Sequence, residues 1–329
     1  MAWHLGRFII GYLCRKLIIS LKRNRRTVFY FLFATCICFF TAAPLIASPK
    51  SSGPGDPVVA STQKEAIDFI DKINSIEPSS QWPNVKPALF LENLRSMAHH
   101  PLSIYPGRGT NFCGYGALTY LVLQDDPLGY LKMLLKLYNE GKADYGKSSF
   151  SPSPEIKLAA GTLRFKGILD IHPAEQMWYL SLADHFKGYL NIFNRRYDQG
   201  DEDTFWASVN YAKFNRMVRK LLNYNVEAKG SDLIRPHTRG TYEYISEKMK
   251  TGIVVLYLNN RILHKKKLEK IKLAIPTHFV VLQSISRVDD TITMVYWDYG
   301  GKTLLQLDSH FLQKIIFGIS HCTKKPTHE

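Results

Sequence analysis

Residues 278–307 read HFVVLQSISRVDDTITMVYWDYGGKTLLQL. β-Branched, aromatic and other apolar residues concentrate in three short runs of this stretch, at 278–285, 291–296 and 303–307. Asp-Asp and Gly-Gly pairs separate the runs, and such pairs are typical of the tight turns that join antiparallel strands. We therefore expect a strand meander here. A preceding run at 252–258, GIVVLYL, predicts one more strand.

Helical patterns dominate the chain before residue 223. Apolar residues recur there at helical spacing, and Pro127 directly after Asp126 is typical of a capped helix start. Helices followed by an antiparallel meander predict an α+β fold, because a parallel sheet would need alternating strands and helices. The segments for which we expect helices are 62–76, 88–97, 116–123, 128–138, 173–193, 204–222 and 311–316.

Charge is distributed unevenly along the 329 residues. The formal net charge is +15, and the first 50 residues hold eight Lys or Arg and no Asp or Glu. The rest of the chain has 35 basic and 28 acidic residues, a net charge of +7 (43 − 8 = 35, and 35 − 28 = 7). A nucleic-acid-binding domain typically spreads a basic stripe over its binding face. We therefore expect no nucleic-acid partner.

A basic amino terminus, residues 1–26, precedes an apolar segment at 27–47 whose last twenty residues carry no charge. Twenty apolar residues in a helix span roughly 30 Å, the thickness of a bilayer core. The preceding basic residues predict a cytoplasmic amino terminus for such an anchor. A cleaved signal peptide is the alternative. Both interpretations place the linker at 48–61 and the domain at 62–329 outside the cytoplasm, in the periplasm or the extracellular space.

Export would leave Cys113 and Cys322 as the cysteines of the domain, because the other three lie before residue 39. In an oxidising compartment these two could form a disulfide. No CxxC motif or Cys/His pair at metal-ligand spacing occurs beyond the leader. We therefore expect neither a structural zinc site nor another cofactor.

Cys113 lies in GTNFCGYGAL, residues 109–118, where a glycine-containing loop leads into a predicted helix. A helix start and a neighbouring imidazole lower the pKa of a thiol and make it a nucleophile. Its commonest alternative role is that of a small buried apolar residue.

His278 begins one predicted strand and Asp298 ends the next, so strand pairing can bring the imidazole and the carboxylate together. A carboxylate in that position would orient the imidazole and stabilise its cation. Capping by His278 and turn formation by Asp298 are the structural alternatives. Asn111 is a candidate oxyanion donor through its side-chain amide, together with the backbone N–H of Cys113. Asparagine in such a loop is also a common turn residue.

The segments 111–118, 242–258 and 277–318 resemble papain-fold cysteine peptidases, in particular the branch that includes bacteriocin leader-processing peptidases. The resemblance implies a nucleophile-bearing helix packed on an antiparallel sheet. It assigns Cys113 as the nucleophile, His278 as the base and Asp298 as the orienting group. It also implies a hydrolase that acts on a peptide or amide bond.

The sequence departs from that family in two places. Gly107 stands where the family usually has a glutamine that donates to the oxyanion, six residues before the cysteine. A helical insertion of about 126–232 separates the nucleophile from the base. A catalytically silent module that binds a peptide or envelope partner is therefore the alternative function, and acyl transfer by the same residues is a third.

A basic run lies just before His278. It reads HKKKLEKIK at 264–272. The run is either a solvated face or a cluster of positive charge that attracts an anionic or envelope-associated substrate.

Overall fold

The computed structural model describes residues 60–107, 109–164, 171–192, 194–260 and 276–325. The predicted basic terminus, the anchor or signal segment at 27–47, nearly all of the linker and the basic run at 264–272 lie outside these ranges. Within the described residues, no helix combines the length and the apolar character that a membrane crossing requires.

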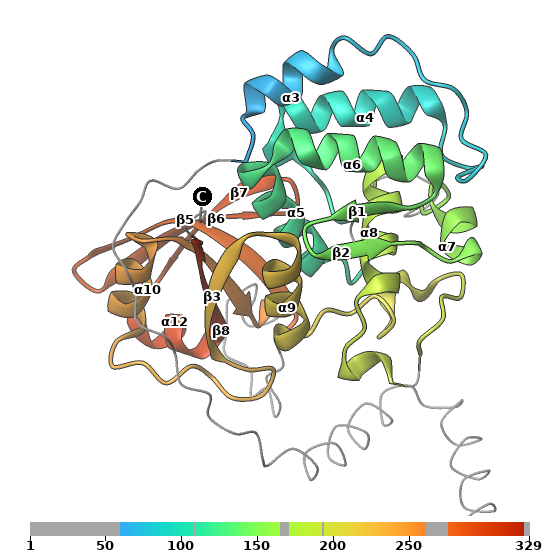
Figure 1. Cartoon of the computed structure of the whole chain (residues 1–329). Coiled ribbons are helices and arrows are strands. Elements are labelled where there is room, and N and C mark those ends of the chain that lie inside the picture. Colours follow the sequence, from blue (N-terminus) through green and yellow to red (C-terminus); the bar gives the residue numbers. More distant parts are fainter. Residues whose placement is uncertain (1–59, 108, 165–170, 193, 261–275, 326–329) are drawn as a thin grey trace, which may run out of the picture. The chain divides into compact units, whose positions relative to one another are not determined.

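Among the described residues, six strands form one antiparallel sheet in the order β3-β8-β4-β5-β6-β7 (Figure 1). The predicted meander forms its β5-β6-β7 half. The strands are β3 (Tyr224–Gly230), β4 (Ile253–Leu258), β5 (His278–Val288), β6 (Thr291–Asp298), β7 (Gly301–Leu307) and β8 (Ile316–Lys324). A separate hairpin pairs β1 (Ala143–Tyr145) with β2 (Ser148–Phe150).

The central strands are apolar on both sides, because helices cover both faces of the sheet. In β4, Val255 and Tyr257 belong to one buried cluster, whereas Val254 and Leu256 belong to another. Successive side chains of a strand point to opposite faces. The unbroken apolar run at 252–258 is therefore explained by burial on two sides.

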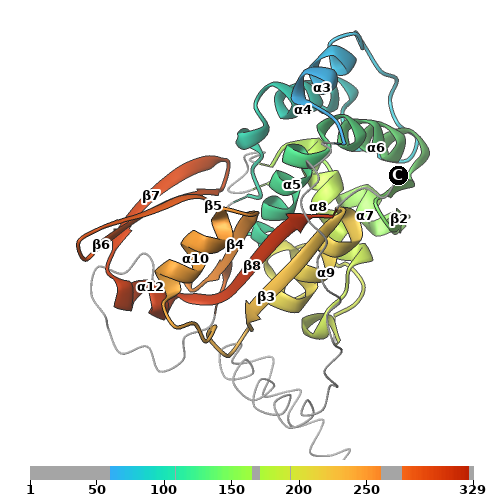
Figure 2. The same cartoon turned by 60° about the vertical axis from the view of Figure 1, so that its left-hand side comes forward.

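Two helical layers enclose the sheet (Figures 1 and 2). Helices α5 and α9 pack against β5 and β3 on one face, and α10 and α12 pack against β4 and β8 on the other. The helices are α3 (Gln63–Ile70), α4 (Pro87–His99), α5 (Cys113–Asp125), α6 (Pro127–Glu140), α7 (Pro154–Ala159), α8 (Pro173–His185), α9 (Tyr211–Leu221), α10 (Thr241–Met249) and α12 (Ser309–Ile315). Short 3₁₀ turns are η2 (Pro101–Ser103), η3 (Tyr189–Asn191) and η4 (Asp201–Asp203).

The α+β prediction is confirmed, as is the helix start at Pro127, where the Asp126 side chain accepts a hydrogen bond from the Gly129 N–H. The purely helical insertion at 126–232 is wrong. Its end forms β3, which pairs along its whole length with β8, and no strand was predicted for β8. β3 escaped detection because it is an edge strand with exposed polar residues, which masks its periodicity.

Three predicted helices are also shorter than expected. The helix predicted over 62–76 ends at Ile70. The helix predicted over 173–193 ends at His185, because Phe186 is extended and a 3₁₀ turn follows. The helix predicted over 204–222 begins only at Tyr211, where the Asn210 side chain caps it by accepting from the Lys213 N–H. The predicted loop at 146–154 contains β2, whose hairpin turns at Gly146 with a φ of 56°.

Candidate active site

Helix α5 begins at Cys113, directly after the fully buried Phe112, and no side chain caps this start. The first N–H groups of a helix have no partner within it, and their partial positive charge favours a thiolate nearby. The Cys113 side chain is half-buried, and its Sγ donates to the Thr277 carbonyl oxygen at 3.6 Å. Thr277 directly precedes β5, so the start of α5 lies against the start of that strand.

Glycines permit this close packing of α5. A Cβ atom on Gly114 would lie 2.8 Å from the Cβ of Val209, and one on Gly116 would lie 3.1 Å from the ring of Pro106. Such separations are too short for an added carbon without movement of the neighbour. The two glycines of CGYG therefore allow the chain on either side to contact the first turn of α5.

His278 and Asp298 meet because β5 and β6 pair antiparallel, which returns the end of β6 to the start of β5. The two side chains interact through His278 Nε2 and Asp298 Oδ2, which lie 3.2 Å apart. The Thr303 hydroxyl donates to the other carboxylate oxygen, Oδ1, at 2.8 Å. Both His278 and Asp298 are largely shielded from water, with 2% and 14% of their side chains exposed.

The contact with Asp298 leaves His278 Nδ1 as the nitrogen available to Cys113. Nδ1 is buried and has no hydrogen-bond partner among the described residues. A carboxylate at Nε2 stabilises both the tautomer with its proton on that nitrogen and the imidazolium cation. The prediction that His278 begins a strand is confirmed, and the residue is buried.

The pKa values of Cys113 and His278 move in opposite directions. Burial disfavours the Cys113 thiolate, but His278 and the backbone N–H groups of Phe279 and Gly114 outweigh this effect and lower the thiol pKa. Burial likewise disfavours the His278 cation, but Asp298 and Cys113 outweigh it and raise the imidazole pKa to about 9. Each group therefore stabilises the charged form of the other.

Cys322 takes no part in this arrangement. Cys113 and Cys322, the cysteines of the described residues, are both free, so the disulfide alternative is wrong for this structure. Cys322 lies in β8 with 1% of its surface exposed, and burial raises its pKa to about 12. It is therefore a core residue without thiolate character.

The oxyanion role predicted for Asn111 is not supported by its contacts. Its Nδ2 group donates to the Thr204 carbonyl oxygen at 2.8 Å and to the Ser208 hydroxyl at 3.1 Å. An amide nitrogen has two protons, so both donors are in use. Asn111 instead fixes the loop at 204–208 beside the start of α5. Gly107 has a φ of 85°, and the Ile171 side chain occupies the space that its side chain would need.

Sequence reasoning missed Tyr299, whose ring stacks on His278 with centroids 4.8 Å apart and planes at 13°. Tyr299 has a φ of 42°, an uncommon value for a residue with a side chain. The following Gly300 and Gly301 signalled a turn, but the direction of the ring depends on backbone geometry that spacing does not reveal. The other missed contact is that of Thr303 with Asp298.

No metal-ligand cluster is found among the described residues, taken as three or more His, Cys, Asp or Glu side chains. Comparisons with protein-family models, with curated proteins and with solved structures found no match to the chain. A functional assignment therefore depends on the fold and on the geometry of this site.

Proposed function

We propose that the chain is a papain-like cysteine hydrolase that cleaves a peptide or amide bond. The observation that carries the proposal is the position of His278, whose Nε2 contacts Asp298 while its Nδ1 remains for the thiol of Cys113. The opposite shifts of the two pKa values support a reactive thiolate. A nucleophile, a base and an orienting group in this order are the minimum for covalent acyl transfer.

In the proposed reaction, the Cys113 thiolate attacks the substrate carbonyl carbon and forms a tetrahedral intermediate. The N–H groups at the start of α5 are the donors nearest to the developing oxyanion. The proton on His278 Nδ1 passes to the leaving amine as the carbon–nitrogen bond breaks, which leaves a thioester on Cys113. Neutral His278 then takes a proton from water, the resulting hydroxide attacks the thioester, and the acid is released with the thiolate regenerated.

A two-part experiment tests the proposal. Alkylation of Cys113 by iodoacetamide at pH 6.5, followed by mass spectrometry, should slow by roughly tenfold or more in His278→Ala. Cys322→Ser is the matched control and should keep the wild-type rate, because Cys322 is buried. Incubation with a mixed-sequence peptide library should yield cleavage products that disappear in Cys113→Ser. Equal alkylation rates in the wild type and His278→Ala would contradict the proposal.

A catalytically silent binding module is the second candidate. The observations that favour it are the engaged amide of Asn111 and the glycine at position 107, because neither can donate a side-chain hydrogen bond to an oxyanion. Iodoacetamide would label Cys113 of such a module slowly, at a rate that does not change in His278→Ala. The peptide library would yield no cleavage products. If an added amine became attached to the acyl group of the substrate, the reaction would be acyl transfer rather than hydrolysis.

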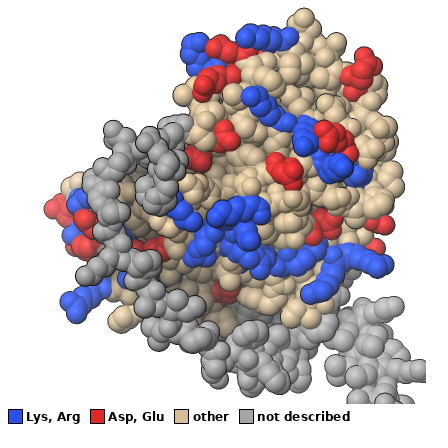
Figure 3. Space-filling model, viewed as in Figure 1, with Lys and Arg blue, Asp and Glu red and all other residues tan. Residues whose placement is uncertain are grey.

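For its location, we propose tethering to the membrane by residues 27–47, or secretion if that segment is removed, with the domain outside the cytoplasm. The uncharged sequence and the preceding basic residues support this placement. Lysine and arginine side chains form a band across one face of the domain, with acidic side chains scattered around it (Figure 3). Helix α9 exposes Arg216, Arg219 and Lys220. These cations are consistent with an anionic or envelope-associated surface nearby.

A further inference from the structure

Two strands form the edges of the six-stranded sheet, β3 at one side and β7 at the other (Figure 2). An edge strand has a row of backbone N–H and C=O groups that point away from its own sheet, and this row can pair with a further strand. The two edges of this sheet differ in how accessible that row is.

The outward row of β3 is already in contact with α9. Just before β3, the Asn223 carbonyl oxygen accepts from the Lys325 N–H at 2.9 Å, so the odd-numbered residues bond toward β8 and the Val226 carbonyl points outward. The Arg219 guanidinium of α9 donates to that carbonyl oxygen at 2.8 Å. A strand that approached β3 would therefore have to displace a side chain of α9.

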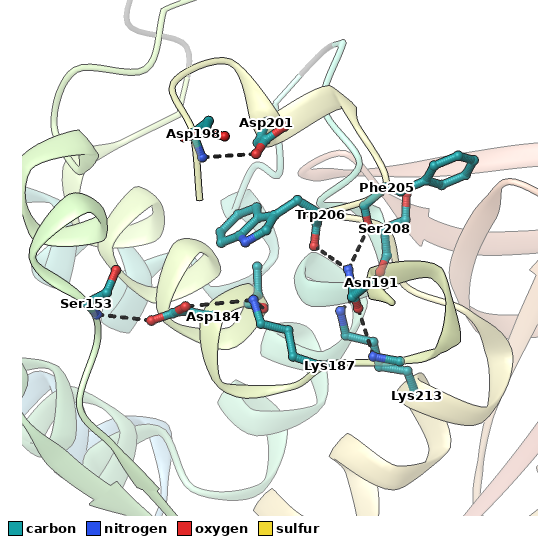
Figure 4. Close-up of polar contacts among 12 residues, drawn as sticks. Ser153, Asp184, Lys187, Asn191, Asp198, Asp201, Phe205, Trp206, Ser208 and Lys213 are labelled. Carbon is teal, nitrogen blue, oxygen red and sulfur yellow. Dashed lines mark hydrogen bonds and ion pairs between the residues drawn. The ribbon is translucent and has the colours of Figure 1, made fainter. Parts of the chain in front are cut away.

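Helix α9 is fixed in this position by a buried side chain. Lys213, with 1% of its surface exposed, donates from Nζ to the Tyr115 hydroxyl at 2.7 Å and to the Ser208 carbonyl oxygen at 3.0 Å (Figure 4). These contacts tie α9 to α5 and to the loop that precedes α9. Pairing at β3 would therefore disturb contacts of the helical layer.

The direction of the backbone groups of β7 follows from the turn before it. Tyr299 and Gly300 join β6 to β7 with φ values of 42° and 80°, and Asp298 pairs with Gly301 across this two-residue turn. A hydrogen-bonded pair closes such a turn, and bonded pairs alternate along an antiparallel ladder. Residues 301, 303, 305 and 307 therefore bond to β6, whereas the backbone groups of 302, 304 and 306 point outward.

The side chains of this outward row are exposed at Lys302, Leu304 and Gln306, and 64% of the Leu304 surface is accessible. β7 pairs with β6 without a bulge, contains no proline and carries one charge, that of Lys302. Edge strands that avoid association typically have a bulge, a proline or several charges. β7 is therefore a regular edge with an exposed apolar side chain at its middle.

The strand is complementary to itself. When a second copy pairs antiparallel along the whole of Gly301–Leu307, Leu304 lies opposite Leu304 of that copy, and Lys302 lies opposite Gln306, so like charges do not meet. The exposed Asp308 follows in extended backbone, with φ −88° and ψ 167°. It becomes a diagonal neighbour of Lys302 of the second copy, which brings opposite charges within reach of each other.

We propose that β7 pairs with β7 of a second copy of this chain, so that two six-stranded sheets join across a two-fold axis. The outward N–H and C=O groups of residues 302, 304 and 306 would bond to those of the second copy, and the two Leu304 side chains would cover each other. One strand edge buries less than the roughly 800 Å² per partner of a standard interface, so we expect a weak dimer. Pairing at β7 does not depend on whether Cys113 is a nucleophile.

A charge exchange at position 304 tests the pairing and its register. The full-length chain in detergent micelles is studied by sedimentation velocity from about 1 to 100 µM, with the detergent contribution subtracted. The proteins are the wild type, Leu304→Lys, Leu304→Glu, an equal mixture of these two variants, and Lys302→Glu. Val288→Lys is the matched control, because Val288 is 71% exposed but ends β5, which is not an edge strand. Circular dichroism checks that each variant is folded.

The protein mass of the wild type should rise from one chain to two with increasing concentration. Leu304→Lys and Leu304→Glu should each weaken this association by roughly tenfold or more, because equal charges then lie opposite each other. Their mixture should restore it, since a lysine then meets a glutamate. Lys302→Glu should also weaken it, because an acidic side chain then lies near Asp308 of the second copy. Val288→Lys should associate like the wild type.

Three results would overturn the proposal. The first is a wild type that stays monomeric over the whole range. The second is a dimer that persists in Leu304→Lys, which would assign the association to another segment. The third is a mixture of the Leu304 variants that associates no better than either alone. If a Leu304 variant fails to fold, an unchanged dimer in Lys302→Glu would likewise contradict the pairing.

Discussion

Tyr299 lies almost flat against His278, with ring centroids 4.8 Å apart and an interplanar angle of 13°. This contact covers one face of the imidazole whose Nε2 meets Asp298. The ring therefore restricts rotation of His278 and shields the His278–Asp298 contact from water, which strengthens it.

Replacing Tyr299 should test this positioning role. Tyr299→Ala should slow alkylation of Cys113 by iodoacetamide at pH 6.5 by about tenfold, because an unsupported His278 stabilises the thiolate less well. Tyr299→Phe keeps the ring and should stay close to the wild-type rate. A slow Phe variant would show that the hydroxyl, rather than the stacked ring, supports His278.

The pH dependence of labelling should reveal the thiolate–imidazolium pair. Because the Cys113 pKa is lowered, alkylation of the wild type should reach half its maximum at a lower pH than in His278→Ala. The variant should instead follow an ordinary thiol with a pKa of about 8.5 or higher. Rates measured from pH 5 to 10 provide the comparison, and superimposable profiles would exclude the pair.

Asp298 should control the charge of His278. Asp298→Asn removes the carboxylate, so the His278 pKa, followed by NMR of the ring, should fall clearly below its value of about 9. A raised folded-state pKa means that protonated His278 stabilises the fold fully below its unfolded value of about 6.5. That contribution is lost as the pH rises through about 9. The difference in free energy of unfolding between the wild type and Asp298→Asn should therefore shrink as the pH rises from about 6.5 to about 9. Unchanged titration of His278 would contradict the assigned contact.

Gly114 should be intolerant of a side chain. Gly114→Ala places a Cβ 2.8 Å from the Cβ of Val209 and should reduce the free energy of unfolding by about 1–3 kcal/mol. Val209→Ala should relieve part of that loss, which a double-mutant cycle by urea denaturation measures. Gly301→Ala is the control, since no heavy atom lies within 4 Å of its added Cβ. Equal losses at both glycines would refute the packing argument.

Cys322 should behave as a core residue. Cys322→Ser buries a hydroxyl in place of a thiol and should lower the free energy of unfolding by about 1–3 kcal/mol. Mass spectrometry of the unfolded wild type with an alkylating agent but no reductant should detect Cys113 and Cys322 as free thiols. A disulfide between them would place the sulfur of Cys113 out of reach of His278.

Local pattern was enough to predict the meander, because β5, β6 and β7 are joined by tight turns with clear Asp-Asp and Gly-Gly signals. The same pattern could not identify β3 and β8. These strands pair with each other across about ninety residues of chain, and such a pairing depends on tertiary contacts rather than on local propensity.

The sequence by itself determined the α+β class, the start of α5 near Cys113 and the positions of His278 and Asp298 at strand ends, because these follow from periodicity and turn chemistry within a few residues. Only the tertiary structure decided that Asn111 binds a neighbouring loop and that Tyr299 covers His278. The first of these relationships joins residues 97 positions apart in the chain. They arise from the packing of helices on the sheet, which residue spacing does not encode.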